Sequence, residues 1–488
     1  MEVKFEKTGL DCLQTVVCEV KNVEQTQELR LNDGMPDVGK VLCCWGQVLL
    51  RSKEWRGNGM SATGGVMVWV LYQPEDGSGP KTLETWVPFQ VKWDFPETDR
   101  DGLMNVDLLL RCADARSLSA RKLMIRVGIS ALGQGMLPGR VEFSGVQTVP
   151  KDVQLLRRSY PVKLPREAGE KAFELEEELT VTPVETLLRC ELRPEIIDRK
   201  IMAGKVVFRG AAALRLLYLD TDGKVRSWTG EIPFSQFEDL DGEYDDTAQA
   251  CVTPAVTNLE LERLEDGAMR LKAGVTAQYV IWDSPVIQTV EDAYSPNRTV
   301  EVQTQALELP MMLDRRQENL RPEQRTEHSG QVVDVFMMTE HPQLQRRGEE
   351  VVMELPVSFQ LLVNDAELRC ETVRTRESWT LPVHESCRLC ASSVPTGWPG
   401  DQGGCVAGEI TVTADTVAGE GLTMVTGLTL GETVPPDPER PSLILRRSCG
   451  QGLWELAKEY GSTVDAIRNA NDLNDDPEKD VMVLIPVL

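Results

Sequence analysis

Cysteine and histidine side chains are the first candidates for chemistry in this chain, because they supply metal ligands and nucleophiles. The 488 residues include 12 cysteines and 3 histidines. Cys387 and Cys390 form a C-x-x-C pair, and His384 and Cys405 are near them in sequence. A zinc site would need a second pair or closely spaced histidines. Ordinary thiols in or near a strand are the preferred interpretation, and we expect no metal ion and no cofactor.

No pattern in the sequence requires an enzyme. His328, His341 and His384 are far apart, and neither a G-x-S-x-G nucleophile nor an H-E-x-x-H motif is present. A loose G-x-G-x-x-A pattern at residues 57–62 precedes a strand, whereas a dinucleotide-binding loop follows one. The acidic stretch 238–246 lacks the spacing of a calcium-binding EF-hand loop, so a solvated turn is expected. We predict a protein without catalytic activity.

Composition limits the partners. The net charge is −25, from 77 acidic and 52 basic residues, and no basic patch stands out. Nucleic acid and anionic membranes are therefore unexpected partners. The N-terminal stretch has no apolar core of signal-peptide length, and no window approaches ~18 apolar residues. We expect a cytoplasmic protein without membrane insertion, and its scattered cysteines are expected to be reduced.

The elements that would position any site are mainly strands, and their pattern repeats. Apolar and aromatic runs end at Tyr72 and at Tyr218, and each is followed by Asp-Gly and later by a Pro-Phe pair. The two tyrosines are 146 positions apart, as are Gly128 and Gly274 in later strand-like segments. Two landmarks with one offset indicate duplication.

A third, fainter copy follows the second. Its strand-like run ends at Val363, and its last strand is expected to end at Gly427, the counterpart of Gly274. The extra length is assigned to a loop over residues 395–404, which is rich in Gly and Pro. The copies are too long for solenoid repeats, so we expect beads on a string.

The fold expected is mainly β, with three tandem β-sandwich-like units and a small α+β domain. The expected boundaries are 1–150, 151–310 and 311–432 for the units, 433–442 for a Pro-rich linker, and 443–488 for the last domain. Proline keeps such a linker extended, so the last domain is expected to be held away from the third unit.

The last stretch predicts the order strand, helix, helix, strand. Residues 443–445 are apolar, and Leu453, Leu456 and Ala457 recur at helical spacing before Gly461. Ser462 is expected to cap a second helix, and residues 481–485 alternate as a closing strand.

This order resembles a LysM domain. The resemblance rests on the helix, turn and strand positions from Gly450 to Pro486, and it implies two helices packed on two antiparallel strands. The usual role of that family is binding N-acetylglucosamine polymers such as peptidoglycan. Here Gly450-Gln451-Gly452 replaces the common Gly-Asp-Thr, which removes two hydrogen-bonding groups. The predicted binding face comprises Gly450, Gln451, Gly452, Leu453, Asn471, Asp472, Leu473 and Asn474. The alternative is that the two leucines are core and the glycines only turn the chain.

The chain as a whole is similar to the SPOCS-plus-LysM, SipL-like spore coat morphogenetic proteins of Clostridia. The similarity is carried by the repeated strand, Asp-Gly and Pro-Phe pattern followed by the LysM-like end. It implies a mother-cell scaffold at the forespore surface that binds the spore coat basement-layer ATPase through its LysM domain. The alternative is a cell-wall protein that binds peptidoglycan or another N-acetylglucosamine polymer.

Overall fold

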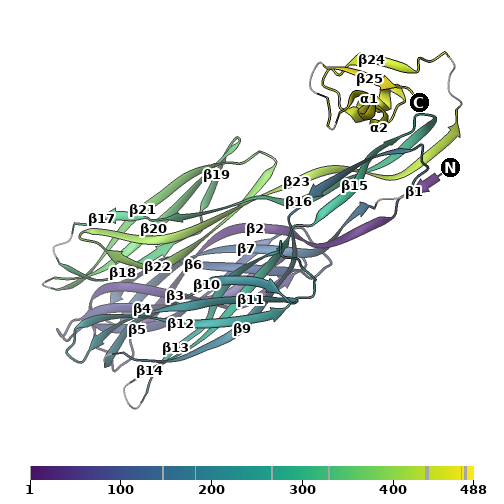
Figure 1. The fold of residues 1–488 in the computed structure, drawn as a ribbon. Helices are drawn as coiled ribbons and strands as arrows, with labels where there is room; N and C mark the ends of the chain where they lie inside the picture. Colours follow the sequence, from purple (N-terminus) through teal and green to yellow (C-terminus); the bar gives the residue numbers. More distant parts are fainter. Residues whose placement is uncertain are drawn as a thin grey trace.

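The computed structural model describes residues 2–145, 148–181, 183–264, 268–327, 330–365, 367–434, 439–473, 475–477 and 481–488. The chain is mainly β, as expected, with 75% of its residues in strands, many small antiparallel sheets and two short helices near the C-terminus. Figure 1 shows an elongated body of strands with the helices in a small module at one end.

The first unit contains two three-stranded antiparallel sheets, ordered β2-β7-β6 and β3-β4-β5. Its strands are β2 (Lys7–Arg30), β3 (Val38–Arg56), β4 (Gly59–Pro74), β5 (Lys81–Asp94), β6 (Leu103–Ser119) and β7 (Lys122–Ser144). In β7 the alternating residues Leu123, Ile125, Val127 and Ile129 are all 0% exposed. The strand-like segment expected around Gly128 is therefore confirmed as part of β7.

The second unit has the same pairing pattern, with sheets ordered β9-β14-β13 and β10-β11-β12. Its strands are β9 (Leu164–Leu179), β10 (Val184–Met202), β11 (Lys205–Asp220), β12 (Val225–Asp239), β13 (Gln249–Arg263) and β14 (Met269–Asp283). A two-stranded ribbon of β8 (Gln154–Pro161) and β15 (Val286–Tyr294) flanks it in sequence.

The third unit repeats the pattern again, with β23 between β16 and β22, and β20 between β18 and β21. Its main strands are β16 (Arg298–Leu320), β18 (Gln331–Thr339), β20 (Glu350–Asn364), β21 (Leu368–Pro382), β22 (Cys387–Asp401) and β23 (Cys405–Thr433). The short strands β1 (Glu2–Lys4) and β17 (Glu323–Arg325) pair with β23, and β19 (Gln343–Arg347) pairs with β20.

Glycine sits opposite a β-bulge in each unit. Gly128 faces the bulge between Leu110 and Cys112, and a Cβ there would lie 2.7 Å from the Cys112 Sγ atom. Gly274 faces the equivalent bulge of the second unit, 2.5 Å from the Thr257 Oγ1 atom. Because a bulge pushes extra side chains over its partner strand, only glycine fits without movement.

In the third unit the glycine opposite the bulge is Gly408, since the bulge lies between Thr396 and Gly400. The expected counterpart, Gly427, pairs with Gln303 of β16 instead. Residues 395–401 belong to strand β22, so the loop predicted there was wrong for that part. Pairing with β23 supplies hydrogen bonds that override the weak strand preference of glycine and proline.

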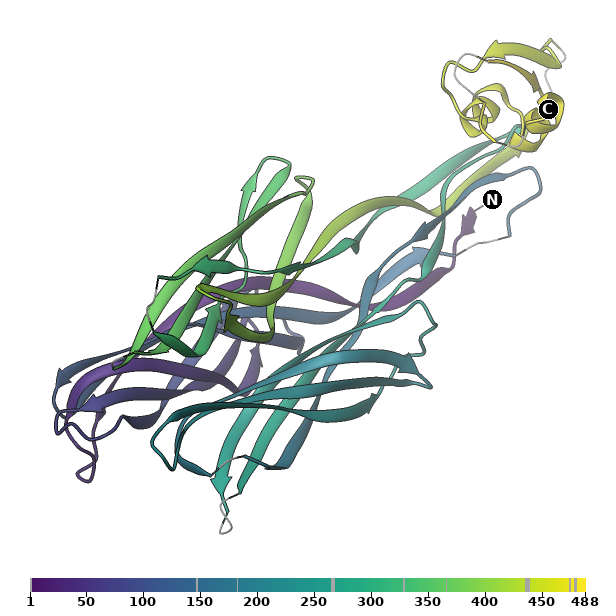
Figure 2. The same ribbon diagram turned by 60° about the vertical axis from the view of Figure 1, so that its left-hand side comes forward.

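The units are not beads on a string. One apolar cluster contains residues of β3–β7 and β9–β14, together with Phe336, Met338 and Leu362 of the third unit. Figure 2 shows the strands of the three units lying side by side in one body. The boundary expected at residue 310 lies within β16, whereas the one at 150 lies between β7 and β8. Residues 435–438 of the expected linker lie outside the described residues.

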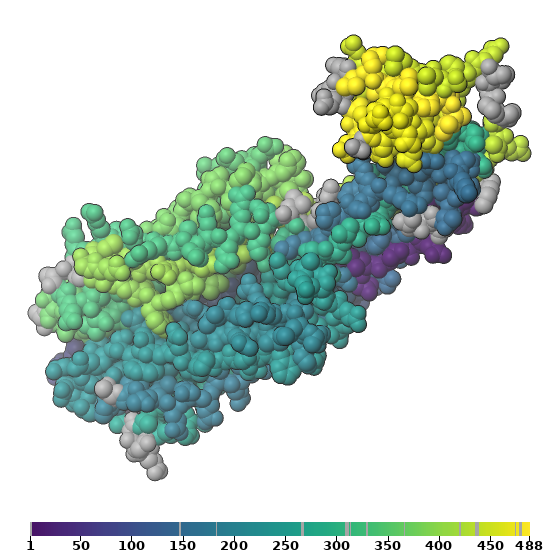
Figure 3. All heavy atoms as spheres, in the orientation of Figure 1, coloured from purple at the N-terminus to yellow at the C-terminus, as the bar shows by residue number. Residues whose placement is uncertain are grey.

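The C-terminal module (residues 443–488) has the expected order: β24 (Leu443–Arg447), α1 (Leu453–Tyr460), α2 (Val464–Asn471) and β25 (Met482–Pro486). The two strands pair antiparallel. Leu453, Leu456, Ala457 and Ile467 of the helices pack with Val483 and Ile485 in one apolar cluster. Figure 3 shows the module as a separate lobe at the end of the molecule.

Candidate functional site

The start of α1 joins the two loops that were predicted to form the binding face. The backbone N–H of Leu453 donates to the Asp476 Oδ1 atom at 2.8 Å, and the N–H of Gly452 donates to the Glu455 Oε2 atom at 3.1 Å. Two helix N-terminal donors are thus satisfied by carboxylates, which also suit the positive end of the helix dipole. The role of Asp476 at the start of α1 was not predicted from the sequence. An acidic residue in the loop after α2 could have indicated it.

Thr463 caps α2, and its Oγ1 atom accepts the N–H of Ala466 at 3.1 Å. The cap expected at Ser462 was therefore displaced by one residue, and Ser462 is 0% exposed. The helix ends at Asn471, and Asp472 follows in the left-handed conformation with φ 52°. Asparagine and aspartate tolerate this conformation better than most residues, which explains an Asp at the C-cap.

Asn471 fastens α2 to β25. Its Oδ1 atom accepts the N–H of Leu484 at 2.8 Å, and its Nδ2 atom donates to the Leu484 and Ile467 carbonyl oxygens at 2.6 and 2.7 Å. The amide has no polar atom left unpaired, and its bonds stabilise the fold of the module.

The remaining predicted residues differ in exposure. Gly450 and Asp472 are exposed, and Gln451 is half-buried with its Nε2 atom 3.2 Å from the Glu459 Oε2 atom. Leu453 is buried and Leu473 is half-buried, and both contact the apolar cluster of the module. Gly452 is half-buried, and Asn474 lies outside the described residues.

The module docks on the end of β15. The Trp454 Nε1 atom donates to the Asp292 Oδ2 atom at 2.9 Å, and the Lys458 Nζ atom lies 2.7 Å from the same oxygen. Tyr294 meets Trp454 edge-on at a centroid distance of 4.8 Å, and its hydroxyl donates to the Ser462 carbonyl oxygen at 3.0 Å. Burial raises the pKa of the Tyr294 hydroxyl. The module therefore contacts the body through β15, which lies in the range 151–310 expected for the second unit.

A buried ionic cluster lies where the three units meet, which we call the three-unit junction (Trp45, Arg189, Arg215, Asp334 and Phe336). The Asp334 carboxylate is 1% exposed and lies 2.8 Å from the Arg189 Nη1 atom and 2.7 Å from the Arg215 Nη2 atom. The Arg189 guanidinium also lies over the rings of Trp45 and Phe336. One arginine of the second unit thus contacts both other units.

A cavity of about 160 Å³ borders this junction. Its walls come from all three units, among them Leu108, Glu195, Val256 and Thr339. Burial raises the pKa of the Glu195 carboxyl. No pair of these lining groups is arranged as a nucleophile with its base. We therefore interpret the cavity as imperfect packing between the units.

His341 is fully buried beside the cavity. Its Nε2 atom lies 3.3 Å from the Asp107 carbonyl oxygen, and its Nδ1 atom accepts the N–H of Ser393 at 3.4 Å. These partners indicate a neutral imidazole protonated at Nε2. Burial lowers the pKa of His341 below 6.5. Among the other histidines, His384 is exposed and His328 lies outside the described residues.

Four cysteines form disulfides, which corrects the expectation that all thiols are reduced. Cys18 pairs with Cys390, and Cys43 pairs with Cys370. Cys387 stays a buried free thiol, so the C-x-x-C motif does not act as a unit. Sequence spacing could not reveal these pairs, because their partners are 372 and 327 positions apart. The parts of the chain that are described hold no group of three or more His, Cys, Asp or Glu side chains suited to a metal ion.

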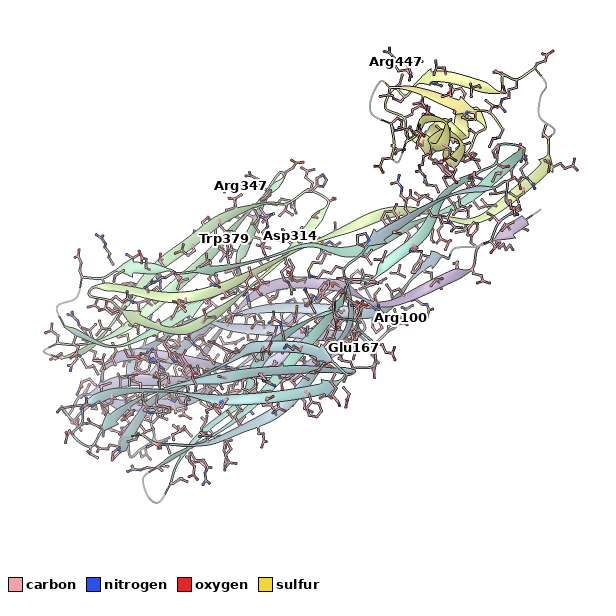
Figure 4. All side chains as sticks on the ribbon, viewed as in Figure 1. Arg100, Glu167, Asp314, Arg347, Trp379 and Arg447 are labelled. Atoms are coloured by element: carbon pink, nitrogen blue, oxygen red, sulfur yellow. A yellow bond between two sulfur atoms is a disulfide. The ribbon has the colours of Figure 1, made fainter. Side chains whose placement is uncertain are left out.

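The acidic turn at residues 238–246 is organised by Glu167, which Figure 4 labels. The Glu167 carboxylate accepts the N–H groups of Asp241 and Gly242 at 3.1 Å and the hydroxyl of Tyr244 at 3.0 Å. Burial and the Glu167 charge raise the pKa of the Tyr244 hydroxyl.

Within the described ranges, neither helix has the length and apolar character needed to cross a membrane.

Comparison with known proteins gives one family match. The family described as SipL, SPOCS domain matches residues 183–264. This segment runs from the start of β10 to the end of β13, so it includes one complete sheet of the second unit and a strand of the other. No curated protein matches the chain, and no solved structure matches it. The chain therefore contains a SipL SPOCS domain over residues 183–264.

Proposed function

We propose that this chain is a non-enzymatic scaffold in spore coat assembly, with three β-sandwich-like repeat units and a LysM-like module that binds a coat basement-layer protein. The observation that carries the proposal is the SPOCS match over residues 183–264. Support for three such units comes from the strand pairing around that match, which occurs again in residues 7–144 and 298–433. Several contact surfaces on one chain raise avidity without any single tight site.

The binding face proposed on the module is narrower than the sequence suggested. Gly450 and Asp472 lie at the surface, and Gln451 and Gly452 are half-buried. Leu453, Asn471 and Leu473 support the face from within, through the apolar cluster and the bonds to β25.

A protein partner fits this face better than a glycan. A sugar is oriented by hydrogen bonds, but the N–H groups of Gly452 and Leu453 are already taken by carboxylates. The exposed Asp472 carboxylate suits a basic group on a protein. The partner we propose is the spore coat basement-layer ATPase, met in the mother cell at the forespore surface. Peptidoglycan is the competing ligand.

The test measures binding of the full-length chain to the purified ATPase and, separately, to insoluble peptidoglycan. Asp472→Asn keeps the side-chain shape and its tolerance of positive φ but removes the charge. We expect it to weaken ATPase binding about tenfold, the effect of losing one charge-assisted hydrogen bond. Gln451→Arg changes the same face and is expected to weaken binding as well.

The matched control is Asp465→Asn, which removes an exposed charge at the opposite end of α2. It should leave ATPase binding unchanged. If the chain sediments with peptidoglycan and does not bind the ATPase, the wall-binding function replaces the scaffold function. Equal loss of binding in Asp472→Asn and Asp465→Asn would mean that the face is placed wrongly.

A further inference from the structure

The third unit meets the first two units through both polar and apolar side chains. It has apolar clusters of its own, one around Phe359 and one around Met353, and it also contributes Phe336, Met312 and Leu422 to clusters shared with the other units. The polar side chains buried at its boundary with the other units are Arg189, Asp334, Glu340, His341 and Gln360. A boundary that is partly polar permits relative motion of its two sides more readily than a wholly apolar core does.

Two cysteine pairs cross this same boundary. Cys18 of β2 and Cys43 of β3 belong to the first unit, and their partners Cys390 of β22 and Cys370 of β21 belong to the third. The Cα atoms are 6.4 Å apart in one pair and 5.6 Å in the other, which is within the range a disulfide can span. Both covalent links of the described chain therefore join the same two units.

We propose that these cysteine pairs are redox-modified sites that fasten the third unit to the first when oxidised and release it when reduced. The proposal concerns the docking of the units and does not depend on the spore coat function or on the C-terminal module.

The chemistry is thiol–disulfide exchange with a low-molecular-weight disulfide. One cysteine thiolate attacks the disulfide, forming a mixed disulfide and releasing one small thiol; the second cysteine displaces the other small thiol and closes the protein bridge. Each bridge formed oxidises two protein thiols and reduces one small disulfide to two thiols. A small dithiol reverses both steps.

The positions of the sulfurs favour reaction at these sites rather than elsewhere. Cys18, Cys390 and Cys370 are half-buried, so a small reagent can reach one side of each bridge. Cys44 is next to Cys43 but is fully enclosed, and burial raises the pKa of its thiol. It stays protonated and does not attack the neighbouring bridge.

Each bridge joins residues more than 300 positions apart, so it holds together two folded units that are connected along the chain only through the second unit. Once both are reduced, the polar contacts and the shared apolar clusters oppose opening without a covalent link. Opening would expose the groups around Asp334 to water.

The experiment compares hydrogen exchange of the full-length protein after treatment with oxidised glutathione and after treatment with a phosphine reductant. Alkylation and peptide mapping should first find Cys18 linked to Cys390 and Cys43 linked to Cys370 in the oxidised sample only. We expect amides of β18, β21 and β22 to exchange about tenfold faster or more after reduction, since opening releases the cross-linked unit. Amides of β24 and β25, in the C-terminal module away from both bridges, should change little.

The variant Cys18→Ser/Cys370→Ser lacks both bridges and should show the fast exchange under either treatment. The control Cys405→Ser/Cys449→Ser removes two free cysteines and should respond to reductant as the wild type does. Absence of the linked peptides in the oxidised sample would overturn the proposal. Equal exchange in oxidised and reduced wild type would overturn it too, and that result needs no variant to fold.

Discussion

Asp334 is the residue on which the three-unit junction depends. It is buried and pairs with an arginine from each of two neighbouring strands of the second unit. Asp334→Ala would leave Arg189 buried without its anion, so we expect a loss of about 3–5 kcal/mol of unfolding free energy. Urea denaturation measures this loss. Asp314→Ala removes an exposed partner of Arg316 and should cost less than about 1 kcal/mol; equal losses in the two variants would contradict the account.

Asn471 makes a second residue-scale prediction. Asn471→Ala removes three hydrogen bonds and leaves the Leu484 N–H and carbonyl oxygen without their side-chain partner. We expect the module to lose about 2–4 kcal/mol of stability. Hydrogen exchange of residues 482–486 reports this, and Asn469→Ala on the exposed side of the same helix serves as control. If the β25 amides are equally protected from exchange in the two variants, Asn471 does not stabilise this strand.

At the scale of elements, the docking of the module on β15 rests on one aromatic side chain. Tyr294 is 5% exposed and belongs to the apolar cluster of the module. Tyr294→Ala removes the ring that Trp454 packs against, and we expect the module to swing free of the body. Tyr294→Phe loses only the bond to the Ser462 carbonyl oxygen and should cost about 1 kcal/mol.

Small-angle scattering of the full chain separates these cases. Release of the module should increase the radius of gyration in Tyr294→Ala and leave it almost unchanged in Tyr294→Phe. An unchanged radius in Tyr294→Ala would show that Asp292, Trp454 and Lys458 hold the module without the ring.

Elements with strong periodicity could be predicted from the sequence. The strand-like segment around Gly128 identified part of β7, and the helical spacing of Leu453, Leu456 and Ala457 identified α1. The strand over residues 395–401 could not, because its formation depends on pairing with β23 rather than on its own residues. The glycine that corresponds to Gly274 is the one opposite a bulge, here the bulge between Thr396 and Gly400. A single sequence does not show where bulges lie, so this glycine could not be identified from it.

The same limit applies to the candidate site. The sequence assigned Asn471, together with Gly450, Gln451 and Asp472, to the predicted binding face. The bonds that the Asn471 amide makes to β25 could not be predicted, because they depend on a strand that follows more than ten residues later. Contacts between residues far apart in sequence were also missed at Asp292 and Asp476.

For the whole molecule, the sequence predicted three similar parts but not their association. Contacts such as Arg189 with Asp334, or Cys43 with Cys370, join residues separated by 145 and 327 positions. The 146-residue offset carries no information on such pairs, since it compares equivalent positions rather than touching ones. Side chains of all three units pack in one shared apolar cluster, and Figure 4 shows the side chains on the strands of this body.

Because His341 is buried where the units pack together, its titration makes the stability of the whole molecule depend on pH. Burial holds the pKa of this imidazole below 6.5, the value of an unperturbed group. The unfolded chain therefore binds a proton that the folded chain does not, so this group removes stability as pH falls below 6.5 and has no effect above it. His341→Gln keeps a polar side chain without this titration, and the fall in stability should become shallower.

Asp107 and Glu340 beside it act in the opposite direction, because burial raises the pKa of each carboxyl above its ordinary value. Each carboxyl binds a proton more readily in the folded chain and so offsets part of the loss at acid pH. Asp107→Asn removes one carboxyl that binds a proton in the folded chain, and it also removes the charge that attracts a proton to His341. The fall in stability at acid pH should therefore become steeper in this variant. Thermal unfolding midpoints between pH 5 and pH 8 test both variants, and equal slopes in wild type and His341→Gln would mean that His341 does not cause the pH dependence.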